Sequence, residues 1–574
     1  MTLESIVLCL LANLVLTASA EGISTPSGCR TIPGDISWPT SEQWDLLNRT
    51  VNGNLIATIP IAAPCHETLF GEPSPIFNQA ECDALLNTWF YPTTHLPSSS
   101  SPMAYMFSNN SCNPFLGPET PCTIGYLVVY AINATSVEDI QAGLQFAKEN
   151  NIRLVIRNTG HDYLGKSTGA HALGIWTHNL KSMELIQDFK DENYTGPAVK
   201  ISAGVRVVEA YEFADSHNLI VVGGNCPTVG FAGGYIQGGG HGPLSSRFGL
   251  AADQVLEYEV VTSDGKLITA SDNNNSDLFW ALRGGGGSTY GIVISVTVKA
   301  FQDTSFSMSY LQIPNNGTNT DQLYSVIGTF IETLPKLVDA GVVAIFVVSA
   351  TGFSLTPAIA PGMQPTDLDS HFNPVLDKLH SLNLAYNYTS SAYPTFLSTF
   401  NAVSTVSNVS DQNIGGRFIP RSLVENNGTN ALVDAIRYIS TQAGSLFVGN
   451  AISVEGGASS PDDIAANPHF REALISATVG NYIDYMSKST TSTRIRNITD
   501  DLLPKLETLT PGGGAYLSEG DVHQPNFQST FYGDHYDKLL QIKQQYDPQD
   551  IFYAQTAVGS EQWGQNSDGR LCHG

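Results

Sequence analysis

The chain has 574 residues, 42% of them hydrophobic, which is enough to bury a large core and suggests two or three structural units folded as a compact whole. Its formal net charge of −26 and its pI near 4.7 argue against binding to nucleic acid or to anionic membranes, because both attract clustered lysine and arginine. The composition is that of an ordinary globular protein with an acidic, solubilising surface.

The first twenty residues predict a signal peptide. An apolar run from Ile6 to Leu16 precedes Ala18-Ser19-Ala20, the small-x-small pattern that signal peptidase cleaves, so the mature chain should begin near Glu21. The segment before the run carries Glu4 and no lysine or arginine, which departs from the usual pattern. About eleven apolar residues are too few to span a bilayer, so we expect no membrane anchor in the mature protein.

Glycosylation signals occur along the whole chain. Ten Asn-x-Ser/Thr sequons begin at Asn48, Asn109, Asn133, Asn193, Asn274, Asn316, Asn387, Asn408, Asn427 and Asn497. Following a signal peptide, they favour a eukaryotic secretory glycoprotein that ends in the medium, the cell wall or a vacuolar lumen.

Seven cysteines are left once Cys9 leaves with the signal peptide, an odd number for an oxidising compartment. Five of them lie between Cys29 and Cys122, and Cys572 lies at the other end of the chain. Cys226 stands alone in a glycine-rich segment. If Cys226 has a separate role, six cysteines can form three disulfides, and all fifteen pairings stay open.

From Gly125 onward the pattern predicts a βαβ unit. The strand GYLVVYAI precedes a helix opened by Ser136, with Asp139 three residues later at capping-box spacing. One face of this helix is apolar and carries Val137, Ile140, Leu144 and Ala147. The strand RLVIRN then runs directly into the turn TGHDYLGKSTG.

A second unit of the same order is expected next. AVKISAGV predicts a strand, Val207 to Ser216 a helix, and LIVVGG a strand that ends in a turn at Asn225. Both turns follow the carboxyl ends of strands, where α/β folds usually place ligands. Leu256 to Ser271 then predicts a hairpin around Ser263-Asp264-Gly265, and Gly291 to Phe301 a β-branched closing strand.

After Gln302 the pattern changes to longer segments. Asp321 to Ala340 and Asn430 to Ala443 predict helices, and VVAIFVVSA and LFVGNAISV predict strands. We therefore expect an antiparallel sheet backed by helices. Near Leu503 the chain is expected to return to the first domain and to end in a helix from His535 to Tyr546 and the segment YDPQDIFY.

The segment Gly223 to Asp253, GGNCPTVGFAGGYIQGGGHGPLSSRFGLAAD, carries the most chemical information. Its glycines expose backbone N–H groups and lack Cβ atoms, so the main chain can approach a pyrophosphate or a flat ring system. Glycine density alone also fits a packed loop. The segment GGGGSTYG at Gly284 to Gly291 lacks the Gly-Lys-Ser/Thr ending of an NTPase loop, and neither segment has the strand, GxGxxG and helix order of a Rossmann site.

Other chemistries are not indicated. The thirteen histidines show no HExxH spacing and the cysteines form no paired CxxC motifs, so we expect no metal site. We also expect no Ser-His-Asp nucleophile elbow.

Three segments together resemble one family: RNTGHDYLGKSTG, GNCPTVGFAGGYIQGGGHG and YDPQDIFY are similar to the berberine bridge enzyme-like oxidoreductases. These belong to the FAD-binding family named after p-cresol methylhydroxylase and vanillyl alcohol oxidase. The segment WTHNL is similar to the corresponding segment of fungal members, including those called isoamyl alcohol oxidases and others from secondary-metabolite clusters. The resemblance implies an α+β fold, with a two-part FAD-binding domain of the p-cresol methylhydroxylase type and an inserted antiparallel-sheet substrate domain.

The domain limits that follow begin with the signal peptide at 1–20 and a disulfide-rich region at 21–120, which joins the FAD domain from about 60. The FAD-binding domain is expected at 121–302 and the substrate-binding domain at 303–502. The C-terminal segment 503–574 would return to the FAD domain.

By this resemblance FAD is held by two covalent bonds. His161 matches the histidine bonded to the flavin 8α carbon, and Cys226 matches the cysteine bonded to C6; an imidazole nitrogen and a thiolate are suitable nucleophiles for the electron-poor ring. Without the resemblance, a hydrogen-bonded turn histidine and a buried thiol are the simpler interpretations. The other cofactor contacts that it implies are Arg157, Asn158, Thr159, Gly160 and Asp162 around the pyrophosphate, the bed of Gly230, Gly233, Gly234, Gly238, Gly239 and Gly240, and Leu250, Asp253 and Val293.

Flavin oxidations usually need a base that takes a substrate proton as hydride leaves. In AYLSEGD, Glu519 occupies the position of the tyrosine base of plant members, and Ser518 stands where the family has asparagine. A carboxylate beside the flavin could act as the base, although a salt-bridged loop glutamate fits equally well. Tyr516 and Asp521 are secondary candidates, and His241 is either a neighbour of the cofactor or a loop histidine.

Val229 matches the position where a small side chain is associated with oxygen access to flavin C4a, which favours an oxidase. The expected reaction removes hydride from an alcohol, a sugar or a secondary metabolite, passes it to FAD and then to O₂, and gives hydrogen peroxide. A dehydrogenase that uses another acceptor is one alternative. A secreted flavin-binding glycoprotein without turnover is the other, and the oligomeric state is left open.

Overall fold

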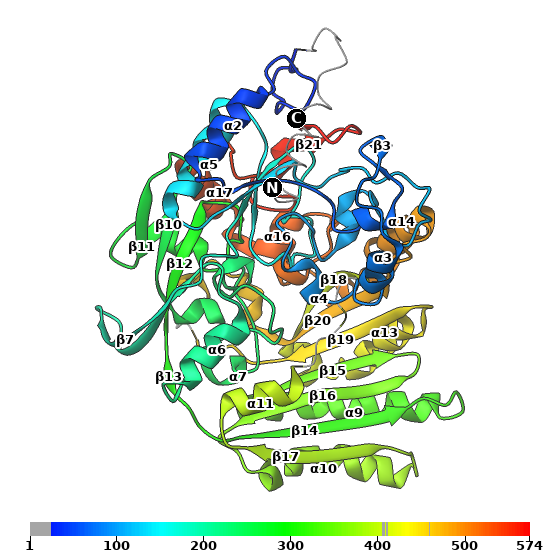
Figure 1. Ribbon diagram of the computed structural model, residues 1–574. Coiled ribbons are helices and arrows are strands. Elements are labelled where there is room, and N and C mark those ends of the chain that lie inside the picture. Colours follow the sequence, from blue (N-terminus) through cyan, green and yellow to red (C-terminus); the bar gives the residue numbers. More distant parts are fainter. Residues whose placement is uncertain (1–23, 405–407, 409–410, 458–459) are drawn as a thin grey trace.

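The computed structural model describes residues 24–404, 408, 411–457 and 460–574, so the predicted signal peptide lies outside the described residues. Figure 1 shows two halves: the four-stranded and five-stranded sheets with the C-terminal helices form the upper one, and a long seven-stranded sheet with its helices forms the lower one. None of the described helices is long and apolar enough to cross a lipid bilayer. The fold is α+β, as predicted.

The first sheet contains the predicted βαβ unit. Its strand order is β1 (Leu55–Ala57), β4 (Tyr130–Asn133), β6 (Leu173–Trp176), β5 (Leu154–Arg157), and both β4 and β5 pair with β6 in parallel. Helix α5 (Val137–Glu149) joins β4 to β5, and the predicted capping box between Ser136 and Asp139 forms. The predicted apolar face holds, because Ile140, Leu144 and Ala147 are fully buried. Strand β4 is shorter than predicted, because residues 125–127 form a turn.

The second sheet is antiparallel, in the order β11 (Leu267–Ser271), β10 (Val255–Val261), β12 (Ile292–Lys299), β8 (Thr195–Ser202), β7 (Met183–Lys190). The predicted hairpin and closing strand are confirmed. The second βαβ unit is wrong: β8 pairs only with antiparallel neighbours, and β9 (Leu219–Ile220) pairs with β13 (Phe301–Gln302). Helix α6 (Val207–Asp215) forms as expected, but beyond β9 the chain turns into the glycine-rich segment instead of joining a ladder.

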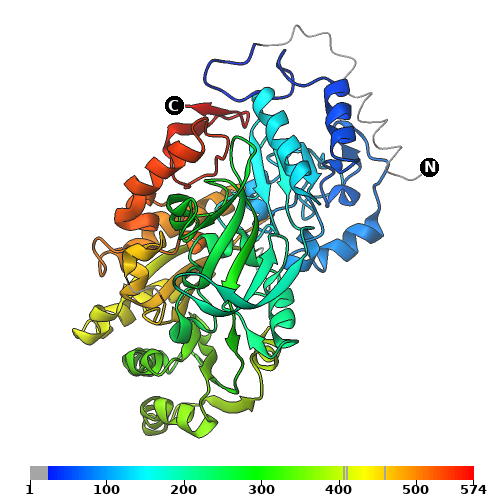
Figure 2. The same ribbon diagram turned by 90° about the vertical axis from the view of Figure 1, so that its left-hand side faces the viewer.

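The third sheet has seven antiparallel strands and fills the lower half of Figure 1. Its order is β17 (Asn387–Tyr393), β14 (Phe306–Pro314), β16 (Gly352–Pro361), β15 (Val343–Ser349), β19 (Ser445–Ala451), β20 (Ala473–Tyr482), β18 (Gln412–Pro420). Helices α9 (Thr320–Asp339), α10 (Pro365–Ser381) and α13 (Thr429–Thr441) pack on it and bury a second core around Phe330 and Phe346. The predicted helix-backed sheet is therefore confirmed, and Figure 2 shows these helices end-on below the upper half.

Shorter elements complete the chain. The helices are α2 (Ser41–Thr50), α3 (Gln79–Leu86), α4 (Pro92–His95), α7 (Ser245–Phe248), α8 (Ser276–Leu282), α11 (Phe396–Val403), α12 (Arg421–Glu425), α14 (Lys488–Asn497), α15 (Leu503–Glu507), α16 (Phe527–Tyr532) and α17 (Tyr536–Tyr546). The strands β2 (Thr68–Leu69) and β3 (Glu72–Pro73), and β21 (Trp563–Gln565) and β22 (Leu571–His573), form two small hairpins.

Three disulfides form among the described cysteines: Cys29–Cys572, Cys65–Cys82 and Cys112–Cys122. Cys226 is free. The first bridge fastens the N-terminal segment to the C-terminal hairpin, and the other two close short loops. Three disulfides and one separate cysteine are what the odd count had suggested.

The packing bears on the proposed domain limits. Leu503 and Leu506 of α15 are buried in the second core, whereas Ala515 and Leu517 belong to the first. Helix α2 packs on α5, and β1 pairs with β4. We therefore propose that the FAD-binding half begins near residue 41 and resumes near residue 510.

Candidate active site

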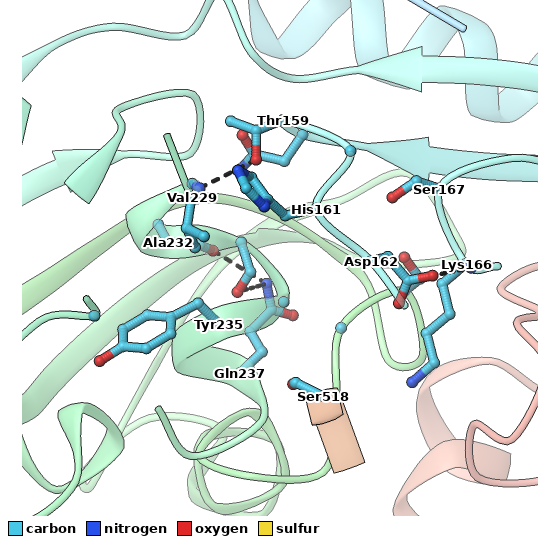
Figure 3. Close-up of a pocket in the computed structure, with 18 of the residues that line it drawn as sticks. Thr159, His161, Asp162, Lys166, Ser167, Val229, Ala232, Tyr235, Gln237 and Ser518 are labelled. Carbon is cyan, nitrogen blue, oxygen red and sulfur yellow. Dashed lines mark hydrogen bonds between the residues drawn. The ribbon is translucent and has the colours of Figure 1, made fainter. Parts of the chain in front are cut away.

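One cavity of about 310 Å³ lies between the turn after β5, the turn after β9, strand β12 and residues 516–519. Figure 3 looks into it. Of the predicted cofactor contacts, its lining includes Asn158, Thr159, Gly160, His161, Asp162, Cys226, Val229, Gly230, Gly233, Gly234 and Val293. Segments far apart in the sequence thus meet at one concave surface.

His161 and Cys226 lie side by side in one wall of this cavity. The Cys226 Sγ lies 3.8 Å from His161 Nε2, and both contact the Thr228 hydroxyl, at 3.4 Å and 2.6 Å. Burial works against the thiolate, but the His161 ring and Thr228 outweigh it and lower the pKa of Cys226 to about 6. At neutral pH the sulfur is therefore mostly a nucleophilic thiolate. Thr228 was not predicted, and its place two residues after Cys226 was the available signal.

The glycine bed fits closely against the first turn. A Cβ atom on Gly230 would lie 2.6 Å from Asn158 Oδ1, and one on Gly233 would lie 2.9 Å from Asn158 Nδ2. The Gly230 N–H donates to the Thr159 hydroxyl at 3.2 Å, and Asn158 donates to the Ala203 carbonyl. Only glycine allows the two turns this approach.

The same bed leaves room at Gly234 and holds one buried acceptor, at Asn158, without a donor. A Cβ on Gly234 would meet nothing within 4 Å, and the buried Asn158 Oδ1 has no hydrogen-bond partner within the described structure. A buried acceptor without a donor is costly, so a ligand group that donates a hydrogen bond would be favoured there. These features, with the His161 and Cys226 nucleophiles, fit a large flat cofactor such as FAD.

Arg157 lies outside the cavity lining. Its guanidinium donates to the backbone carbonyls of His95 and Ser98, and it fills the space that a Cβ on Gly160 would need. Arg157 therefore supports the turn from behind. This position gives no support to the predicted contact between Arg157 and the pyrophosphate.

The remaining predicted cofactor contacts also lie outside the lining: Gly238, Gly239 and Gly240 of the bed, and Leu250 and Asp253. Asp253 forms an ion pair of 2.6 Å with Arg471, which precedes β20, and accepts from the Leu250 N–H. Leu250 packs against Phe418 and Phe470. These residues join the two halves of the molecule beneath the cavity.

Glu519 and His241 form a hydrogen-bonded pair in the cavity wall, with Oε1 3.0 Å from Nε2. Thr478 of β20 donates to the other Glu519 oxygen at 3.4 Å. The edge of the Tyr516 ring packs on His241, with 5.2 Å between centroids. Burial raises the pKa of Tyr516, which keeps its hydroxyl protonated.

Asp521 points away from the cavity. Its carboxylate accepts from the Thr499 hydroxyl and the His523 N–H, and it is fully buried outside the lining. Burial raises the pKa of Asp521, as expected for a carboxyl without a cationic partner at contact distance. It stabilises the 521–524 turn, which gives no support to the catalytic role suggested for it.

The lining also contains residues that the sequence did not identify: Tyr163, Lys166, Ser167, Tyr235, Gln237, Gly287, Ser288 and Leu517. Gly287 belongs to GGGGSTYG, whose glycine density was the available signal once the NTPase interpretation was rejected. Gln237 donates to the carbonyls of Ala232 and Gly233, which holds the glycine bed in shape. Within the ranges described, no group of three or more His, Cys, Asp or Glu side chains could hold a metal ion.

Comparisons with known proteins agree with this geometry. Residues 129–271 match the family described as FAD binding domain, and residues 515–559 match the family described as berberine and berberine like. The FAD-linked oxidoreductase sor8 of Hypocrea jecorina is 42% identical over 97% of this chain and 95% of its own length. The chain belongs to the berberine bridge enzyme-like FAD-linked oxidoreductases. FAD is the cofactor of this oxidoreductase.

Solved structures extend the comparison. The VAO-type flavoprotein MtVAO615 from Myceliophthora thermophila C1 superposes on this oxidoreductase with a TM-score of 0.89 at 36% identity, covering 95% of this chain and 100% of that one. The glucooligosaccharide oxidase of Acremonium strictum, at 20% identity and a TM-score of 0.62 over 75% of this chain and 92% of its own, shares the fold. That enzyme carries a 6-S-cysteinyl, 8α-N1-histidyl FAD.

Proposed function

We propose that this oxidoreductase is an oxidase whose FAD is bonded to both His161 and Cys226. The observation that carries the proposal is the pair of nucleophiles 3.8 Å apart in one cavity wall, one of them a thiol with a pKa near 6. The bicovalent flavin of the Acremonium strictum enzyme supports it at the level of the fold. Asn158, Thr159, Gly230 and Gly233 would hold the rest of the cofactor.

The proposed overall reaction oxidises an alcohol, a sugar or a secondary metabolite. A substrate carbinol loses a hydride and a hydroxyl proton to become a carbonyl compound, and O₂ takes up two electrons and two protons to become H₂O₂. When bound, FAD accepts the hydride and later passes the electrons to O₂. The protein must position the carbinol and receive its proton.

Glu519, hydrogen-bonded to His241, is the proposed proton acceptor. Both side chains line the cavity, and Thr478 fixes the second carboxylate oxygen. A carboxylate held this way can take a hydroxyl proton while the imidazole keeps it oriented. Tyr516 packs on His241 and would hold that ring in place.

Val229 supports the choice of O₂ as the acceptor. Its small side chain lies in the cavity lining directly before Gly230 of the glycine bed, where a larger one would obstruct access. A dehydrogenase that uses another acceptor is the alternative, and peroxide yield under air distinguishes the two.

Secretion is proposed on independent grounds. Three disulfides use every described cysteine except Cys226, which is typical of an oxidising compartment. Sequon asparagines such as Asn193, Asn274, Asn316 and Asn427 are exposed.

The test is anaerobic bleaching of the flavin with a panel of alcohols, sugars and polyketides, followed by peroxide measurement in air. Glu519→Gln should slow bleaching by about 100-fold or more while flavin content stays unchanged. Glu472→Gln removes the carboxylate of another histidine pair, His469–Glu472, outside the cavity lining, and should have no effect. Equal rates for both variants would overturn the role of Glu519, and absence of bleaching across the panel would favour a non-catalytic glycoprotein.

A further inference from the structure

The cavity contains one cationic side chain whose ammonium contacts no carboxylate of the described residues. Lys166 is the only lysine or arginine in its lining, and its ammonium has no hydrogen-bond or ion-pair partner in the part of the chain that the structure describes. Both carboxylates of the lining are already engaged. Asp162 accepts the N–H groups of Leu164 and Lys166, and Glu519 pairs with His241.

The turn that carries Lys166 is held in place by Asp162. The Asp162 carboxylate holds the Lys166 N–H and thereby shapes the turn. In Figure 3 the Lys166 chain extends toward the side of the cavity where Ser518 lies, across His161 from Thr159. Ser167, next in sequence, also lines the cavity and adds a hydroxyl donor.

Burial makes this arrangement costly without an anion. Desolvation lowers the pKa of Lys166, and the nearby charge of Asp162 only partly opposes it. An anion brought to the ammonium would form a charge-assisted hydrogen bond in a partly desolvated site, where such bonds are strong. The cavity is therefore electrostatically prepared for a negatively charged group.

We propose that Lys166 binds a carboxylate of the substrate, so that the oxidised alcohol belongs to an acid-bearing class of molecule. This inference rests on the proposed function and narrows its substrate. The FAD pyrophosphate and the flavin ring are the other sources of negative charge, and in Figure 3 the Lys166 side chain extends away from Thr159, which favours the substrate.

The test uses holoenzyme and two probes of the same shape, benzoate and benzamide. Binding is followed by the change in the visible flavin spectrum, which needs no turnover. Wild type should bind benzoate about 10- to 100-fold more tightly than benzamide, with the preference decreasing at high salt. Lys166→Gln should lose the preference and Lys166→Arg should retain most of it.

Lys336→Gln is the matched control. Lys336 is exposed on α9, so this variant makes the same change in net charge far from the cavity and should keep the benzoate preference. A Lys166→Gln holoenzyme that keeps the preference would overturn the inference. Loss of bound FAD in Lys166→Gln would also overturn the inference, because it would assign Lys166 to cofactor binding. A shifted flavin potential with the benzoate preference intact would overturn it for the same reason. A wild-type protein without flavin would instead overturn the proposed function.

Discussion

The acidity of Cys226 can be tested without any substrate. The His161 ring and Thr228 together outweigh burial and bring the thiol pKa from 9.0 to about 6. At pH 7 this means roughly 90% thiolate, against roughly 1% for a thiol of pKa 9. Removing the ring in His161→Ala takes away the strongest lowering contribution and leaves burial, so the pKa should rise toward 9.

The assay is iodoacetamide alkylation of flavin-free protein, produced under riboflavin starvation, as a function of pH. The other described cysteines are in disulfides, so the modified peptide should be that of Cys226. Wild type should reach its half-maximal rate near pH 6, and His161→Ala should react about 10- to 100-fold more slowly at pH 7. His217→Ala, at an exposed position, should match wild type. An unchanged pH profile in His161→Ala would refute the electrostatic reasoning.

Three further predictions concern stability. Gly230→Ala places a Cβ against Asn158 and should lower the free energy of unfolding by about 1–3 kcal/mol, measured by urea unfolding. The Cβ of Gly234→Ala meets nothing in the protein, so the free energy of unfolding of the flavin-free protein should change by less than about 0.5 kcal/mol. Gly234→Ala should instead reduce the flavin content, measured by visible absorbance. Arg570 lowers the pKa of Asp35 to about 2, so the ion pair stabilises the fold above about pH 4. This stabilisation is lost as the pH falls toward 2 and Asp35 becomes protonated. Asp35→Asn should therefore flatten the pH dependence of Tm over that interval. Cys572→Ser opens a bridge that spans 543 residues and should lower the free energy of unfolding by about 3–5 kcal/mol. A Tm equal to that of the wild type under non-reducing conditions would contradict this prediction.

Local signals in the sequence predicted local structure well. The Ser136–Asp139 capping box, the hairpin at Ser263 and the apolar face of α5 each depend on neighbours within a few residues. The second βαβ unit was wrong because strand pairing is decided by distant partners: β8 found β12, about a hundred residues later.

The site divides in the same way. Glycine density located the bed, and the motif around His161 located the first turn. The His241–Glu519 pair joins positions 278 residues apart, and Arg157 turns its side chain toward His95, so neither followed from spacing. Asp521 lies two residues from Glu519, yet the chain turns between them and buries it elsewhere.

The central claim is that His161 and Cys226 both carry the flavin. The most direct measurement is acid precipitation of the purified protein, followed by visible absorbance and peptide mass spectrometry of wild type, His161→Ala and Cys226→Ala. The account predicts a yellow wild-type precipitate with flavin mass on both peptides, and flavin retained on the partner peptide in each single variant. A colourless precipitate with both wild-type peptides unmodified would contradict it.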